Sequence, residues 1–139
     1  MQVTIRSPVY PTEAQEHVET ALTNLFALDP PFDEEEDHLV IILPKKRNSL
    51  GLVKQRIHAF RIIDAVRSRL LSNWNGRETT ICFDKQAAYH GKLRLIDDRQ
   101  EDPLLGSIEV SIEFEQETEF YEFLAWFTPP TKNGSIISG

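Results

Sequence analysis

Three short segments with strand-like alternation lie close together in the second half of the chain. They are TTICF at 79–83, KLRLID at 92–97 and SIEVSIEF at 107–114. Apolar residues that alternate with polar ones are typical of strands with one buried face. Strands that follow one another in this way favour an antiparallel sheet. We therefore predict an α+β fold, a mostly antiparallel sheet with helices packed on one face.

The first half of the chain is predicted to contribute two strands and one helix. VTIRSPVY at 3–10 alternates like a strand, and HLVIILP at 38–44 is almost entirely apolar, as central strands are. Between them, apolar residues recur at the i, i+3, i+4 and i+7 spacing of a helix with one buried face. These residues are Val18, Ala21, Leu22 and Leu25.

Two further helices complete the predicted order β-α-β-α-β-β-β-α. The chain from about Leu50 to Trp74 is predicted as helix, either continuous or divided into a short and a longer piece, with Gly51 as the weak point. The last helix is ETEFYEFLAWF at 117–127. Residues 1–130 are predicted to form a single domain, and residues 131–139 a loose tail.

Charge and cysteine content restrict the classes of function. The chain has 22 Asp and Glu against 15 Lys and Arg, a net charge of -7, which disfavours unspecific binding to phosphate backbones. A single cysteine, Cys82, excludes an internal disulfide and a zinc site of several thiolates. We recognise no membrane-spanning run and no signal peptide. We therefore expect a cytoplasmic protein.

Two arginines of the long helix fall on its apolar side. On a helical wheel, Arg56 and Arg67 lie within one broad apolar arc. A buried guanidinium needs a partner, because an unpaired buried charge is very costly. We predict ion pairs with Asp or Glu, within the chain or across a subunit interface. The alternative is an anion-binding site on this helix. The arc is formed by Ile57, Phe60, Ile63, Leu70, Leu71 and Trp74.

The opposite side of the same helix is basic. It carries Lys54, His58, Arg61 and Arg69. Together with KKR at 45–47, these residues can form a basic stripe for phosphate contacts. The alternative is an ordinary solvated helix face, which the excess of carboxylates in the chain favours.

KQAAYHGK at 85–92 is the sharpest candidate for a binding segment. Gly91 permits a positive φ, and the two alanines allow close approach of another backbone. Tyr89 supplies a stacking ring between Lys85 and Lys92, a combination that suits single-stranded RNA. The alternative is a tight connection between strands, packed against a neighbouring subunit, and we favour it slightly.

Little in the sequence indicates catalysis. The four histidines are scattered, and zinc-protease, dithiol, serine-hydrolase and P-loop motifs do not occur. Cys82 is interpreted as a core residue, and DEEED at 33–37 as a solvated acidic loop. We predict no catalytic residue, cofactor or metal site. An enzyme would require Arg56, Arg67 and Lys85 to converge in one pocket around an anionic substrate.

Four segments occur in the order found in a known family. They are SPVYPTE at 7–13, QRIHAFRIIDAVRSRLL at 55–71, DKQAAYHGKLRLID at 84–97 and DPLLGSIEVSIE at 102–113. Together they resemble the archaeal uncharacterised protein family two hundred and one, over nearly the whole chain. The resemblance implies a fold similar to the large-subunit ribosomal protein that binds 5S RNA, and it implies a dimer. Asp84 stands where the family usually has asparagine, which lowers the positive potential there.

Two functions follow as hypotheses. The first is a non-enzymatic dimer with a fold similar to RNA-binding ribosomal proteins, in which the acidic chain disfavours general RNA binding. The second is an RNA-binding protein, which requires one contiguous positive face. The residues of that face would be Lys54, Arg61, Arg69, Lys85, Tyr89 and Lys92.

Overall fold

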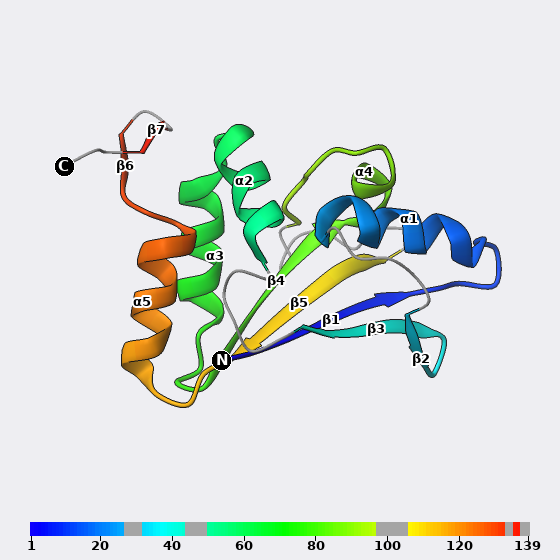
Figure 1. The fold of residues 1–139 in the computed structure, drawn as a ribbon, viewed down its shortest axis with the longest axis horizontal. Helices are drawn as coiled ribbons and strands as arrows, with labels where there is room; N and C mark the ends of the chain where they lie inside the picture. The colour runs from blue at the N-terminus through cyan, green and yellow to red at the C-terminus, as the bar shows by residue number, and fades with distance from the viewer. Residues whose placement is uncertain (27–31, 44–49, 97–105, 133–134, 137–139) are drawn as a thin grey trace.

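A computed structural model describes residues 1–26, 32–43, 50–96, 106–132 and 135–136 (Figure 1). The strands are β1 (Gln2–Pro8), β2 (Asp33–Glu35), β3 (His38–Leu43), β4 (Glu78–Asp84), β5 (Ser107–Glu113), β6 (Thr131–Lys132) and β7 (Ser135–Ile136). The helices are α1 (Gln15–Phe26), α2 (Gly51–Ala59), α3 (Ile63–Asn73), α4 (Lys85–Tyr89) and α5 (Glu117–Phe127).

Five strands form one open sheet in the order β2-β3-β1-β5-β4, and every neighbouring pair is antiparallel. The predicted α+β fold class is confirmed. The division of the long helix into two pieces agrees with one of the two predicted alternatives. The element order differs from the prediction because α4, β2, β6 and β7 were not predicted and one predicted strand is reduced to a single bridge.

The two faces of the sheet differ in character. On one face Ile5 lies opposite Val110, which lies opposite Ile81, and all three are buried. This face packs with residues of α1, α2, α3 and α5 in one hydrophobic cluster. On the other face Thr4 lies opposite Ser111, and the exposed side chains are polar. Alternation along the strands therefore separates the core from a polar sheet surface.

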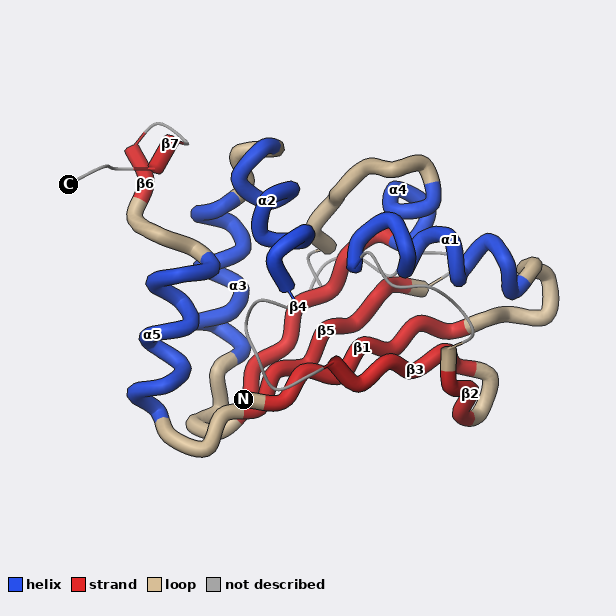
Figure 2. The backbone as a smooth tube through the Cα atoms, in the orientation of Figure 1, coloured by secondary structure: helices blue, strands red, loops and turns tan. Residues whose placement is uncertain are grey.

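The helices form two groups (Figure 2). α1 and α4 lie side by side, and α2, α3 and α5 gather on the β4 side of the sheet. The Trp74 ring after α3 stacks on Phe120 of α5 with 4.0 Å between centroids, and Phe114 meets Phe120 edge-on at 5.5 Å. Among the described residues, no helix has the length and hydropathy needed to cross a bilayer. The stripe predicted for α1 is buried as expected: Val18, Ala21, Leu22 and Leu25.

The predicted helix from Leu50 to Trp74 breaks at residues 60–62, so Gly51 was the wrong weak point. Arg61 adopts a φ of 57°. The N–H of Arg61 donates to His58 and that of Ile62 to Ile57, both at 3.2 Å, which is the bonding pattern of a Schellman helix end. The wheel drawn through this break was therefore also wrong in part. Phe60 and Leu71, which it placed in the apolar arc, are 46% and 43% exposed.

The predicted strand KLRLID at 92–97 is wrong as a strand. Leu95 forms an isolated antiparallel bridge with Phe83 of β4. Two backbone bonds of 2.9 Å, from Asp84 to Arg94 and from Ile96 to Cys82, hold this segment along β4. Cys82 itself is buried within β4, as predicted. The segment is therefore extended along β4, but it does not form the regular ladder that the alternating pattern predicted.

KQAAY, expected to be a connection between strands, forms the short helix α4 instead. The Asp84 side chain caps it by accepting from the backbone N–H of Gln86 at 3.0 Å. Asp84 also pairs with Arg94 at 3.2 Å. Gly91 has a φ of 76°, in agreement with the predicted positive φ. An aspartate at position 84 therefore serves as a helix cap, a role that asparagine shares.

The acidic run at 33–37 is a β-hairpin rather than a loop. β2 pairs with β3, and the turn residues Glu36 and Asp37 have φ values of 47° and 64°. Two positive φ values are typical of a tight hairpin turn. The basic segment at 45–47 lies outside the described residues. Within the predicted tail, β6 and β7 pair with each other.

Candidate functional site

Lys85 lies at the start of α4 and is only 3% exposed. Its Nζ donates to the carbonyl oxygen of Pro8 and to Oε1 of Glu13, both at 2.7 Å. The same carboxylate oxygen accepts from the backbone N–H of Tyr10 at 3.0 Å. Burial lowers the pKa of Lys85, while the hydrogen bond and the charge of Glu13 act in the opposite direction. The ammonium therefore joins β1, the turn before α1 and α4, and does not face a solvent-borne phosphate.

A cavity of about 340 Å³ lies beside this ion pair, between the first turns of α1 and α4. The Tyr89 ring stands between two histidines, with centroid distances of 4.7 Å to His17 and 5.1 Å to His90. Asn24 of α1 donates to the carbonyl oxygens of Ala88 and Tyr89 at 2.9 and 3.2 Å. The cavity is lined by Glu13, His17, Val18, Lys85, Gln86, Tyr89 and His90.

Arg56 connects α2 to the turn that follows α4. Its Nη1 donates to the carbonyl oxygen of Gly91 at 2.9 Å. The next residue, Lys92, is exposed. This contact brings a residue of α2 beside the end of KQAAYHGK. The Arg56 guanidinium was predicted to pair with Asp or Glu, whereas in the structure it donates to a backbone carbonyl.

The Arg67 side chain of α3 lies against the carboxyl end of α5. Its Nε donates to Thr128 at 2.9 Å, its Nη2 donates to Pro129, and its Nη1 pairs with Asp64 at 3.3 Å. His58 of α2 bonds the carbonyl oxygen of Phe127 at 3.0 Å. Side chains of α2 and α3 therefore occupy the carbonyl groups that a helix leaves without internal partners at its end.

The remaining predicted cations are spread over this group of helices. Lys54 lies over the ring of Trp126 on α5, 4.5 Å from its centroid. Arg61 is exposed in the turn between α2 and α3, and Arg69 is half-buried on α3. The six predicted RNA-contact residues therefore do not form one continuous face, since Lys85 is enclosed in its ion pair.

The three cations required by the enzyme hypothesis have different partners. Arg56 binds the turn at Gly91, Arg67 binds the end of α5, and Lys85 binds Glu13. Of these three, Lys85 alone lines the cavity between α1 and α4. The described geometry does not gather them around one anionic substrate.

Charge is segregated along the described chain. Residues 50–73 carry five Lys and Arg and one carboxylate, Asp64, whereas residues 107–122 carry six carboxylates without a cation. On and beside the polar sheet face, arginines are paired with carboxylates. The pairs are Arg6 with Glu35, Arg77 with Glu113 and Arg94 with Asp84. Among the described residues, the helices α2 and α3 therefore carry more positive charge than the sheet.

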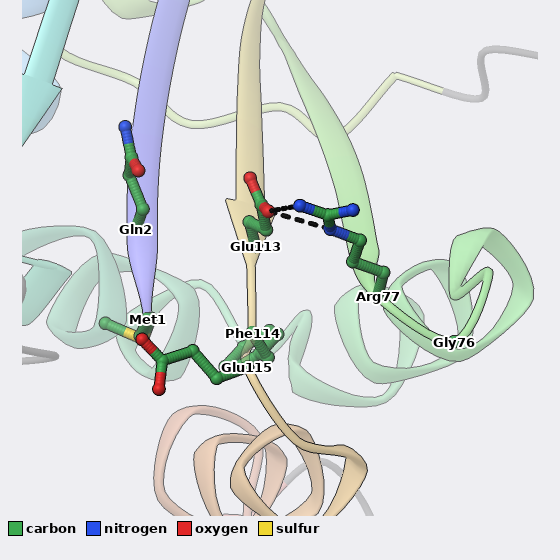
Figure 3. Close-up of a pocket in the computed structure, with 7 residues that line it drawn as sticks. All are labelled: Met1, Gln2, Gly76, Arg77, Glu113, Phe114 and Glu115. Carbon is green, nitrogen blue, oxygen red and sulfur yellow. Dashed lines mark hydrogen bonds and ion pairs between the residues drawn. The ribbon is translucent and has the colours of Figure 1, made fainter.

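A second cavity, of about 490 Å³, lies at the opposite end of the sheet from β2. Figure 3 shows the Arg77 side chain extended toward Glu113 of β5, and the two bond at 2.8 Å. Arg77 is 79% exposed. Because the Arg77 charge is paired and exposed to water, this cavity does not provide a charged group that is shielded from solvent.

Glu13, His17 and Asn24 belong to the cavity region and were not predicted from the sequence. They lie on or just before α1, far along the chain from α4. One feature of the sequence did point to this contact. The pair Ala87 and Ala88 was expected to allow the close approach of another backbone. α1 makes that approach, through the bond from Asn24 to Ala88.

Comparisons by sequence and by structure both find UPF0201 proteins as relatives. A family model described as RNA binding matches residues 2–114. A UPF0201 protein of Sulfurisphaera tokodaii is 33% identical over 135 residues, covering 96% of this chain and 90% of the relative. A UPF0201 protein of Thermococcus onnurineus is 33% identical over 139 residues, covering 98% and 97%. The crystal structure of a UPF0201 protein from Methanococcus jannaschii matches with a TM-score of 0.75 at 24% identity, covering 99% of this chain and all of that one.

Proposed function

Because the chain belongs to the UPF0201 family, and its family model is described as RNA binding, we propose that it is a non-enzymatic RNA-binding protein. The proposal includes a cytoplasmic location, which suits a chain whose single cysteine is buried and free. General affinity for nucleic acid is not part of it, since the chain is acidic overall.

The observation that carries this proposal is the local excess of positive charge at residues 50–73. Five cations against one carboxylate give this segment a net charge of +4, within a chain of net charge -7. Electrostatic attraction to phosphates acts over about one Debye length, roughly 8 Å at physiological salt, so the local charge matters more than the total.

Arg61 and Lys92 are the residues that we expect to touch phosphates. Both are exposed. Arg56 fixes the turn that presents Lys92 by binding Gly91. Lys54 and Arg69 are half-buried and add to the positive potential from the same helices.

Lys85 and Tyr89, predicted as direct contacts, receive a different role in this proposal. The Lys85 ammonium holds α4 against β1 and Glu13, and α4 in turn carries Tyr89. Their contribution to phosphate binding is therefore indirect.

Fluorescence anisotropy with a labelled structured RNA, at about 50 and 200 mM salt, tests the proposal. We expect Arg61→Glu/Lys92→Glu to weaken binding at least tenfold at the lower salt, because two phosphate contacts become repulsive. The matched control is Arg6→Glu, a charge reversal at an exposed arginine on the sheet. An equal loss in the control, or wild-type binding that ignores salt, contradicts the proposed surface.

We also propose that the chain forms a homodimer, as its family resemblance implies. Three large apolar side chains on α3, α5 and the turn after α2 are exposed and are the candidates for a subunit contact: Leu71 at 43%, Tyr121 at 51% and Phe60 at 46%. Analytical ultracentrifugation is the measurement, with Leu71→Glu expected to shift the population toward monomer. A wild-type chain that stays monomeric at high micromolar concentration contradicts the dimer.

A further inference from the structure

The cavity between α1 and α4 has the size and lining of a pocket for one planar heteroaromatic ring. We propose that it takes up a single unpaired nucleobase of the bound RNA. The inference rests on the proposed RNA-binding function and adds a site of base recognition to it. A volume of about 340 Å³ lies at the small end of the range for ligand pockets, roughly 300–1,000 Å³, which suits a base more than a larger ligand.

Three aromatic rings line the cavity, one from α1 and two from the end of α4. Tyr89 and His90 come from α4 and its cap, and His17 comes from α1. Tyr89 is half-buried and packs against the core, while both histidines are exposed. Unpaired RNA bases are commonly bound by stacking on tyrosine and histidine rings. A fixed central ring with two exposed neighbours supplies such a stacking surface.

Polar groups at the cavity can read the edge of a base. Gln86 lines it with a side-chain amide, which both donates and accepts, and Glu13 lines it with a carboxylate. The formal charges of Glu13 and Lys85 cancel within their ion pair. A free phosphate therefore meets no net positive charge from this pair, whereas a neutral base can use the donors and acceptors.

The walls of the cavity are held in place at both ends. Lys85 joins α4 to Glu13 before α1, and Asn24 joins α1 to the last carbonyl groups of α4. These bonds fix the spacing of α1 and α4 before any ligand arrives. A preformed pocket lowers the entropic cost of binding.

The cavity adjoins the proposed phosphate contacts. His90 lines it, Gly91 is held by Arg56, and Lys92 is exposed. A nucleotide whose base enters beside Tyr89 and His90 thus has its phosphates near Lys92. This continuity is the reason for assigning the base to RNA rather than to a free nucleoside.

The test uses two RNA hairpins that are identical except at one bulged position, which holds either 2-aminopurine or an abasic site. We expect wild-type protein to bind the base-containing hairpin roughly 5- to 150-fold more tightly, the range that stacking of one base provides. We also expect 2-aminopurine fluorescence to be quenched on binding. Equal affinity for the two hairpins overturns the base pocket and leaves the proposed RNA binding intact.

Ring variants separate stacking from folding. Tyr89→Phe keeps the ring and is expected to keep the preference for the base, whereas Tyr89→Leu is expected to lose it. Because Tyr89 packs against the core, His17→Ala is the second variant, at an exposed position. It is compared with His38→Ala on the acidic hairpin. Loss of the preference in His38→Ala, or its retention in both Tyr89→Leu and His17→Ala, overturns the assignment.

The remaining outcome is that the wild-type protein binds neither hairpin, and a nucleoside titration then tests the cavity without RNA. If wild-type protein binds neither hairpin at low salt, the proposed function fails, and the base pocket of RNA fails with it. Adenosine is then added while the ring resonances of His17 and His90 are followed by NMR. Shifts without RNA binding would assign the cavity to a free nucleoside and overturn the RNA source.

Discussion

Replacing Lys85 by methionine is expected to destabilise the fold strongly. The side chains of Lys85 and Glu13 are 4% and 9% exposed, so the substitution leaves a nearly buried carboxylate without its cation. It also leaves the carbonyl oxygen of Pro8 without a donor. Breaking a buried ion pair by removing one partner costs about 3–5 kcal/mol. That loss is a large share of the roughly 5–15 kcal/mol that stabilises a typical domain.

The double variant Lys85→Met/Glu13→Gln allows the contribution of the ion pair to the free energy of unfolding to be measured by itself. Both charges are gone, and the introduced side-chain amide still offers an acceptor to the N–H of Tyr10. Buried ion pairs replaced on both sides are often close to neutral, so we expect a loss of about 0–2 kcal/mol and a favourable coupling of at least ~2 kcal/mol in the double-mutant cycle.

Urea unfolding at pH 7, followed by the fluorescence of Trp74 and Trp126, measures these differences. Lys92→Met is the matched control, an exposed lysine for which we expect a change within about 0.5 kcal/mol. A loss below ~1 kcal/mol in Lys85→Met, or a double variant as unstable as the sum of its single variants, would refute the buried ion pair.

Three further outcomes follow from the described contacts. Arg67→Met should lower the unfolding free energy by about 2–3 kcal/mol in thermal melts, because the carbonyl oxygens of Thr128 and Pro129 at the end of α5 and the Asp64 carboxylate on α3 lose their charged donor. Gly106→Ala should lower the melting temperature more than Gly76→Ala: both glycines have positive φ, 77° and 96°, but only at Gly106 would a Cβ meet Pro8, at 2.6 Å. Since burial lowers the folded-state pKa of Lys85 below its unfolded value of 10.5, the unfolded chain binds more protons between these two pKa values. The unfolding free energy should therefore rise with pH through that window in the wild type, and a Lys85→Met chain should lack this contribution in pH-dependent urea titrations.

Strands β1 and β5 were predictable from the sequence because their signal is local. Ile5 and Val110 alternate with polar neighbours, and a period of two is sufficient to assign them to one buried face. The α1 stripe was predictable for the same reason at a period of 3.6.

The position of the break between α2 and α3 was not predictable in the same way. Helix ends of this type usually place glycine at the residue with positive φ, and this chain places Arg61 there. The local sequence therefore continued the helical pattern through a point where the backbone turns. The wheel therefore misplaced Phe60 and Leu71, which are exposed, although it placed Ile63 and Leu70 correctly on the buried side.

The roles of the basic residues depend on contacts between distant parts of the chain. Lys85 meets Glu13 across 72 positions, and Arg67 meets Thr128 across 61. Nothing in a short window of sequence distinguishes a lysine enclosed by such a partner from one that faces solvent. The cavity lining was missed for the same reason, since α1 and the turn before it contribute one of its walls.

The salt dependence of RNA affinity tests the central claim most directly. The logarithm of the dissociation constant is measured against the logarithm of salt concentration, for wild type and for Arg61→Glu/Lys92→Glu. Each lost phosphate contact reduces the slope by about one unit, so we expect the double variant to differ from wild type by about two. Equal slopes for the two proteins, or no binding of the wild type even at about 50 mM salt, would contradict an RNA surface on α2, α3 and the Lys92 turn.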